Sequence, residues 1–167
     1  MFTRLESFLG AWTYEAASTQ RILDALTDES LEQAVAPGHR TVRRLAWHIA
    51  QTLPEMMGKT GLAVSGLGEH DPPPATAQEI AEAYKTAASS LEKELRANWT
   101  DATLGEKDDM YGFQWTRGET LGVLLIHQAH HRGQLTVLMR QAGLVVPGIV
   151  GPNKEDWAQW GMQPPEV

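Results

Sequence analysis

Three Thr-x-x-Glu motifs restrict the possible folds of this chain more than any other feature, because each is typical of the start of an α-helix. In such a capping box, the threonine hydroxyl accepts a hydrogen bond from a free backbone amide of the first turn, and the glutamate carboxylate accepts one from the amide of the threonine. The motifs are Thr3-x-x-Glu6, Thr76-x-x-Glu79 and Thr116-x-x-Glu119. They predict three helices, each beginning directly after its threonine.

Apolar residues at helical spacing support a first and a second helix. After Thr3 they recur at steps of three and four residues, as one buried helix face requires. These residues are Leu5, Phe8, Leu9, Trp12, Ala16, Leu23 and Leu26. A second helix is expected to begin near Thr41, after the Pro37-Gly38 break. Pro54 lacks the amide that would donate to Ala50, so this helix is expected either to kink at Pro54 or to restart there.

A long connector rich in glycine and proline follows the second helix and leads to the Thr76 motif. It contains Gly58, Gly61, Gly66, Gly68 and the run Asp71-Pro72-Pro73-Pro74. The third helix is expected to end at about Trp99. The fourth is expected to span roughly 117–142 and to stop at Gly143, since glycine readily takes the backbone conformation that ends a helix.

These elements predict an all-α fold, a four-helix bundle with a long connector between helices 2 and 3. Bundles build their binding sites from side chains on facing helices. The 167 residues fit a single domain, 1–167, with 144–167 as a C-terminal extension. Residues 100–116 are too irregular to assign, although Tyr111, Phe113 and Trp115 alternate like a short strand.

Charge and composition exclude several classes of function. The formal net charge is −7 and no run of lysine or arginine occurs, so we expect no nucleic-acid partner. No apolar run approaches the roughly 18 residues of a membrane span, and the first residues lack the apolar stretch of a signal peptide, so we expect no membrane partner and a cytoplasmic location. The chain has no cysteine, so any metal must be bound through nitrogen and oxygen.

The string HQAHHRGQ, residues 127–134, holds three of the six histidines. His127 and His131 lie one helical turn apart and about 40° apart around the helix, so both imidazoles can reach one point. His130 lies about 60° to the other side of His127 and should point elsewhere. The face of the pair also carries Thr120, Leu124, Gln134 and Leu138, a mixture that suits a buried pocket.

A third ligand must come from another element, because a catalytic divalent ion usually takes three protein ligands. His39 and His70 fall in connectors, whereas His48 lies within LAWHIAQ, in the middle of an apolar helix where an unpaired imidazole would be costly. We therefore predict a metal site formed by His48, His127 and His131. The alternative is that these histidines are ordinary polar residues of a bundle. Gln128 stands where the HExxH motif needs glutamate, which argues against metalloprotease chemistry.

LAWHIAQ followed by HQAHHRGQL resembles the DinB-like family, also called the DinB/YfiT-like metalloenzymes, over about residues 1–143. The tail VPGIVGPNKEDWAQW is similar to an extension found in part of that family. The resemblance implies an up-down-down-up bundle in which His48, His127 and His131 hold a divalent ion, usually nickel, zinc or iron. His130 would then support the site without binding the ion.

Relatives of known activity in that family include S-transferases and a maleylpyruvate isomerase that use a low-molecular-weight thiol such as bacillithiol or mycothiol. A divalent ion lowers the pKa of a bound thiol, as it does that of bound water. Because this chain has no cysteine, it would need an external thiol. The first hypothesis is thus an enzyme, a metal-dependent transferase acting on an electrophilic small molecule. The alternatives are a metal-dependent hydrolase and a metal- or small-molecule-binding module without turnover.

Several further residues are candidates for the pocket. Glu55 is a weak candidate for a catalytic base, two helical turns after His48 on the same face, and the neighbouring Pro54 departs from the uninterrupted helix expected in the family. Gln134 is a better pocket candidate. Arg132 could steer an anionic substrate or form an interhelical ion pair, and Gly133 predicts a close approach of another helix.

The C-terminal extension carries two tryptophans at helical spacing, Trp157 and Trp160. They predict an apolar ridge on a short helix opened by Asn153. This ridge would either cap the bundle or contact a second subunit in a homodimer. Of the two, we expect capping.

Overall fold

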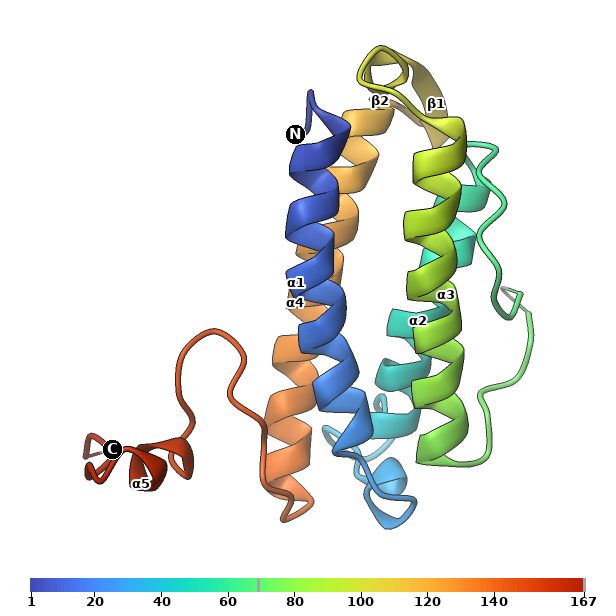
Figure 1. Ribbon diagram of the computed structural model, residues 1–167. Helices are drawn as coiled ribbons and strands as arrows, with labels where there is room; N and C mark the ends of the chain where they lie inside the picture. The colour runs from blue at the N-terminus through green and yellow to red at the C-terminus, as the bar shows by residue number, and fades with distance from the viewer. Residues whose placement is uncertain (69, 167) are drawn as a thin grey trace.

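The computed structural model describes residues 1–68 and 70–166, and four long helices account for most of them (Figure 1). They are α1 (Leu5–Asp24), α2 (Val42–Gly58), α3 (Ala77–Asn98) and α4 (Arg117–Gln141). Helix α1 packs against α3 and α4, and α2 packs against the same two helices. Helices α2 and α3 run in one direction and α1 and α4 in the other, so the up-down-down-up bundle is confirmed.

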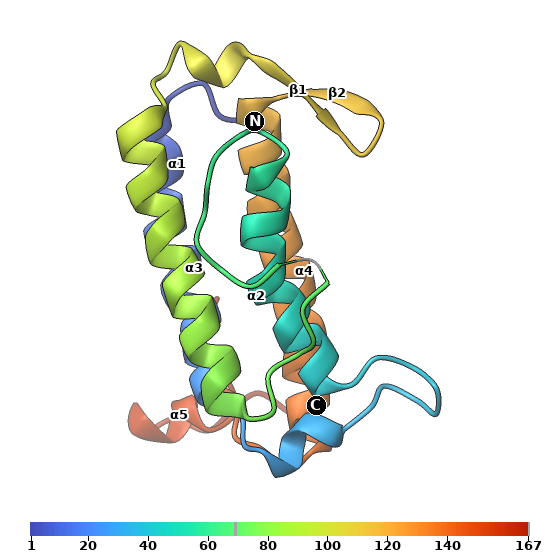
Figure 2. The same ribbon diagram turned by 90° about the vertical axis from the view of Figure 1, so that its right-hand side faces the viewer.

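The parallel course of α2 and α3 explains the long connector. Residues 59–68 and 70–76 return along the length of the bundle, and part of this connector passes in front of α2 in Figure 2. The connector is anchored there by the buried side chain of Leu62 and by a hydrogen bond of 2.8 Å from the Ser65 amide to the Ser90 hydroxyl on α3. A shorter connector could not join helices that point the same way.

Three of the four long helices begin directly after a threonine that caps them. Thr76 and Thr116 form complete capping boxes, and the Thr41 hydroxyl accepts from the Arg44 amide. A helix does follow Thr3, but the predicted capping box there is wrong. Helix α1 begins after Arg4 without a side-chain cap, and the free amide of Leu5 donates instead to the Asp101 carboxylate at 2.7 Å. A tertiary contact thus replaces the local cap that the motif predicted.

Pro54 lies inside α2, which continues to Gly58 without restarting. The connector passes close to this proline, because a Cβ atom on Gly66 would lie 2.9 Å from the Pro54 Cγ atom. The proline ring therefore serves as a packing surface for the returning chain. The two turns of α2 on either side of Pro54 remain one helix, which keeps Glu55 on the element that carries His48.

Residues 100–116, left unassigned from the sequence apart from the strand-like alternation of Tyr111, Phe113 and Trp115, form a turn and a hairpin. A turn of 3-10 helix, η2 (Thr103–Gly105), precedes an antiparallel hairpin of β1 (Lys107–Met110) and β2 (Phe113–Thr116), with Met110 opposite Phe113. Both residues of its tight turn have positive φ, 60° at Tyr111 and 87° at Gly112. The hairpin projects beyond the end of the bundle where α2 finishes (Figure 2), and it brings Tyr111 to the cavity described below.

The remaining elements lie in the connection between α1 and α2, residues 25–41, and in the C-terminal extension. A 3-10 turn, η1 (Glu29–Glu32), lies between α1 and α2, and the C-terminal extension ends in α5 (Asp156–Gln159). Helix α5 buries none of its residues and lies beside the bundle in Figure 1, so the expected capping by Trp157 and Trp160 is wrong. Their rings contact each other at 5.8 Å, and Trp160 is 59% exposed. Across the described residues, no helix is long and apolar enough to cross a membrane.

Candidate metal centre

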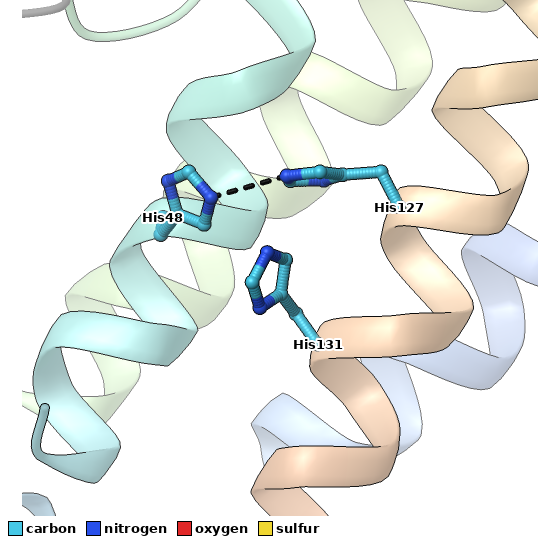
Figure 3. A group of neighbouring side chains, drawn as sticks. All are labelled: His48, His127 and His131. Atoms are coloured by element: carbon cyan, nitrogen blue, oxygen red, sulfur yellow. Dashed lines mark hydrogen bonds between the residues drawn. The ribbon is translucent and has the colours of Figure 1, made fainter.

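Three histidines from two facing helices converge in the middle of the bundle (Figure 3). His48 comes from α2, and His127 and His131 come from successive turns of α4. One ring nitrogen from each lies within 4.8 Å of the others, and the Nε2 atoms of His48 and His127 are 3.1 Å apart. These are the three residues that the sequence selected, and the structure brings them together.

The donor set fits a divalent transition metal. Zinc is bound by imidazole at about 2.0–2.1 Å, so two nitrogens of a tetrahedral site lie about 3.3 Å apart. The separation of 3.1 Å between His48 and His127 is close to that value. Three nitrogen ligands suit zinc, nickel and iron alike, and they leave room for a further ligand. The residues present therefore could hold such an ion.

Gln134 orients one ring of this histidine triad. Its amide oxygen lies 2.7 Å from the Nδ1 atom of His131, and an amide oxygen can only accept, so Nδ1 carries the proton. The Nε2 atom of His131 is then left with a lone pair, which is the form that binds metal. The Gln134 amide nitrogen also lies 3.1 Å from Nε2 of His130. His130 thus contacts the triad through Gln134, which agrees with a supporting role.

The electrostatics of the site keep the imidazoles neutral. Burial, together with the charges of the neighbouring histidines, lowers the pKa of His48 and of His127 to about 4. Burial also lowers the pKa of His131, partly offset by its hydrogen bond to Gln134. Each ring is therefore unprotonated near neutral pH and can offer a lone pair. The Nδ1 atom of His127 is buried without a hydrogen-bond partner among the described residues.

Two cavities with no lining residue in common adjoin the histidine triad, one toward the C-terminal end of α2 and the other toward its N-terminal end. The first, of about 550 Å³, is called here the Tyr111 cavity, and the second, of about 540 Å³, the Arg40 cavity. Residues lining the Tyr111 cavity include Arg44, His48, Gln51, Thr52, Glu55, Met56, His70, Tyr111, Trp115, Val123 and His127. Those lining the Arg40 cavity include Val35, His39, Arg40, Leu45, His130, His131, Gln134, Val137, Leu138 and Gln141. Both cavities are large enough for a small molecule.

Glu55 lines the Tyr111 cavity, but its carboxylate is already engaged. One oxygen accepts a hydrogen bond of 2.8 Å from the Tyr111 hydroxyl, and the other lies 3.4 Å from the Lys59 ammonium. The Lys59 nitrogen also lies 4.8 Å from the centre of the Tyr111 ring. Glu55 therefore fixes the hairpin turn over the cavity, and a role as a free base would require these contacts to break.

Two of the predicted pocket residues lie elsewhere. Thr120 is buried and its hydroxyl bonds to the Thr116 carbonyl of its own helix, and it is not among the residues lining either cavity. Arg132 is buried between α1 and α4, where its Nη2 atom lies 2.6 Å from a carboxylate oxygen of Glu15. Its Nη1 atom also donates to the Thr19 hydroxyl at 3.1 Å. Arg132 thus forms the interhelical ion pair rather than facing the triad.

Gly133 does not mark the expected close approach of another helix. A Cβ atom at this position would meet nothing within 4 Å. The close approach occurs at Gly118, where a Cβ atom would lie 2.0 Å from the backbone oxygen of Phe2. The N-terminal segment is held there by a hydrogen bond from the Phe2 amide to the Gly118 carbonyl.

Sequence reasoning missed most of the cavity walls. Gln51 and Thr52 follow His48 by three and four residues, so helical spacing could have placed them on its face. Tyr111 and Trp115 were noted only for their alternation, and nothing in the sequence brings the hairpin to the triad. Arg40 and His39 belong to the loop before α2, whose path depends on tertiary packing.

Comparison with known proteins gives consistent results. The family described as the DinB family matches residues 1–162. The uncharacterized protein YrdA of Bacillus subtilis (strain 168) is 44% identical over 167 residues, covering 100% of both chains. A crystal structure of a DinB-like protein from Bacillus cereus ATCC 10987 is 46% identical with a TM-score of 0.86, covering 89% of this chain and 99% of that one. The DinB-like protein YjoA of Bacillus subtilis shares the fold, with 17% identity, a TM-score of 0.66 and coverage of 86% and 97%.

Proposed function

The chain belongs to the DinB family, and on that premise we propose that it is a metal-dependent enzyme that transfers a low-molecular-weight thiol to an electrophilic small molecule. The observation that carries the proposal is the convergence of His48, His127 and His131 between two cavities. A centre reached from two sides suits a reaction that joins two molecules. The chain has no cysteine, so the thiol is a substrate and not a side chain.

The residues proposed as ligands are His48, His127 and His131, each through a neutral imidazole. A divalent ion held by them would lower the pKa of a thiol bound to it and favour the nucleophilic thiolate near neutral pH. Because the three ligands are uncharged, they leave the positive charge of the site uncompensated, and an anionic fourth ligand is favoured. Gln134 holds the ring of His131 in the orientation that this arrangement needs.

The walls of the Tyr111 cavity supply the surface for the electrophile. Tyr111, Trp115, Met56 and Val123 present apolar area, and the polar side chains near the triad can orient a substrate. The hydrogen bond from the Tyr111 hydroxyl to Glu55 connects the hairpin turn to α2. This contact holds the Tyr111 side of the cavity in place.

Elemental analysis of untagged protein tests the metal site. We expect about one equivalent of nickel, zinc or iron in the wild type, with loss in His48→Ala, His127→Ala and His131→Ala. His130→Ala is the matched control, since His130 lies next to the site without contributing a converging nitrogen, and it should keep the ion. Full occupancy in two of the first three variants would reject the ligand assignment.

The transferase activity needs a separate test. Metal-loaded protein should accelerate the reaction of 2-mercaptoethanol with 1-chloro-2,4-dinitrobenzene, in which sulfur bonds to the ring carbon, chloride leaves and the thiol proton passes to solvent. His48→Ala should lose the acceleration. If the metal-loaded protein accelerates neither this reaction nor those of a panel of other thiols and electrophiles, a binding module without turnover would describe it better.

A second candidate, a metal-dependent hydrolase, is favoured by one observation. Glu55 lines the same cavity as His48 and His127, where a carboxylate could serve as a general base. Its two oxygens are held by Tyr111 and Lys59, which makes this the weaker proposal. Hydrolysis of an activated ester by the loaded wild type, lost in Glu55→Gln, would favour the hydrolase over the transferase.

A further inference from the structure

Two arginines stand beside the histidine triad without a carboxylate partner. Arg40 lines one cavity and Arg44 the other. Five other arginines have such a partner, as Arg43 does with Glu32 and Arg140 with Glu155, whereas Arg4 and Arg21, which line neither cavity, also have none among the described residues. In the described part of the chain, no ion pair or side-chain hydrogen bond engages Arg40 or Arg44. An unpaired guanidinium facing a cavity is free to bind a carboxylate through two parallel hydrogen bonds.

The two cavities differ in the charge of their remaining walls. The described lining of the Arg40 cavity contains no carboxylate, and it adds His39, His130 and Gln141 as polar groups. The lining of the Tyr111 cavity includes the carboxylate of Glu55 as well as Arg44, together with two aromatic rings. An anion is therefore better accommodated in the Arg40 cavity, and an uncharged ring or apolar group in the Tyr111 cavity.

Arg40 shares its cavity with one member of the triad. His131 lines the same cavity, so the guanidinium can act on a ligand that touches this ring. The guanidinium thus places a positive charge beside the neutral triad in a chain of net charge −7.

We propose that the Arg40 cavity is the binding site for a small carboxylate-bearing thiol, and that its uncharged, apolar or aromatic co-substrate enters by the Tyr111 cavity. The inference rests on the proposed function and assigns each reactant to one side of the triad. Arg40 binds the carboxylate, and Val35, Leu45, Val137 and Leu138 contact the aliphatic part of the ligand. The sulfur then reaches the triad beside His131.

A matched pair of probes tests the assignment in metal-loaded protein. 3-Mercaptopropionate and 3-mercaptopropionamide have nearly the same shape and differ in charge. Binding to the cobalt-loaded protein is followed by the thiolate-to-cobalt absorption band, so no turnover is needed. We expect the carboxylate to bind about tenfold more tightly than the amide in the wild type, as one charge-assisted contact provides. Arg40→Gln should abolish this preference, and the control Arg44→Gln should keep it.

A second measurement separates this inference from the proposed function. Propionate is added to the metal-free protein, and backbone amide signals are followed by NMR. We expect shifts around residues 35–45 and 130–141 in the wild type and in Arg44→Gln, and none in Arg40→Gln. If the protein takes up no cobalt, the metal site is rejected. The propionate titration needs no metal, so it would still test the anion site.

Two outcomes would overturn the inference. Equal affinity for the two thiols in the wild type would show that no charge on the ligand is recognised. Loss of the preference in Arg44→Gln, with retention in Arg40→Gln, would assign the anion to the Tyr111 cavity. Both arginines are exposed at the surface, so the variants should fold, and circular dichroism checks that they do.

Discussion

Acid should destabilise the metal-free protein through the histidine triad. The pKa values of His48 and His127 are lowered from 6.5 to about 4 in the folded chain. Between these values the unfolded chain binds more protons than the folded one, so stability falls as the pH falls. The contribution of each ring is present in full above pH 6.5 and is lost progressively as the pH approaches 4.

The size of the effect follows from the two pKa values. Lowering the pH from about 7.5 to about 5 protonates the unfolded ring and leaves the folded ring mostly neutral, which costs about 2 kcal/mol per ring. Both rings are partly exposed, so solvent screening should reduce this figure about twofold. We therefore expect His48 and His127 together to account for about 2 kcal/mol of lost stability, a substantial part of the 5–15 kcal/mol of a typical domain.

Urea unfolding in the presence of a chelator measures this loss at the two pH values. The control is the double variant His48→Gln and His127→Gln, which lacks both titrating rings. Carboxylates and other groups titrate in both proteins, so the difference between the two pH profiles isolates the pair. Parallel profiles for wild type and variant would refute the reasoning, because the rings would then have the same pKa in the folded and unfolded chains.

Three further predictions concern stability and assembly. Arg132→Met should lower the free energy of unfolding by about 3–5 kcal/mol, since it leaves the Glu15 carboxylate partly buried and unpaired. Urea unfolding of the double variant with Glu15→Gln should show that much of this loss is restored. The metal content should not change in either variant. Gly118→Ala should cost about 1–3 kcal/mol because its Cβ atom would overlap the Phe2 backbone, whereas Gly133→Ala should stabilise by up to about 1 kcal/mol in the same assay. The homodimer was the alternative to capping, and light scattering of the full chain tests it: since α5 is not buried against the bundle, twice the chain mass is expected, and the mass of one chain would reject the dimer.

The bundle and the triad were predictable because both depend on helical periodicity. The motifs at Thr76 and Thr116 act within one turn of chain, so their capping boxes form as the sequence predicts. The spacing of His127 and His131 alone places them on one helix face. The apolar sequence around His48 predicts that its side chain faces the interior of the bundle. Whether the triad binds an ion remains a prediction, although its geometry fits one.

The errors have a common physical origin in contacts between distant segments. The Thr3 motif does not cap its helix, and the distant Asp101 instead accepts a hydrogen bond from the free amide of Leu5. Gly133 resembled a packing site, yet the close contact occurs at Gly118, where the N-terminal segment lies against α4. The hairpin that carries Tyr111 has strands of only four residues, too short for their alternation to be distinctive.

The origin of the cavity walls has a consequence for how this protein could diversify. The three histidines stand on long helices, whereas Tyr111 and Trp115 come from the hairpin, His70 from the connector, and Arg40 from the loop before α2. Loops tolerate substitution and changes of length far better than packed helices do. Descendants of this chain could therefore exchange one substrate for another by altering three surface segments, with the reactive centre inherited unchanged.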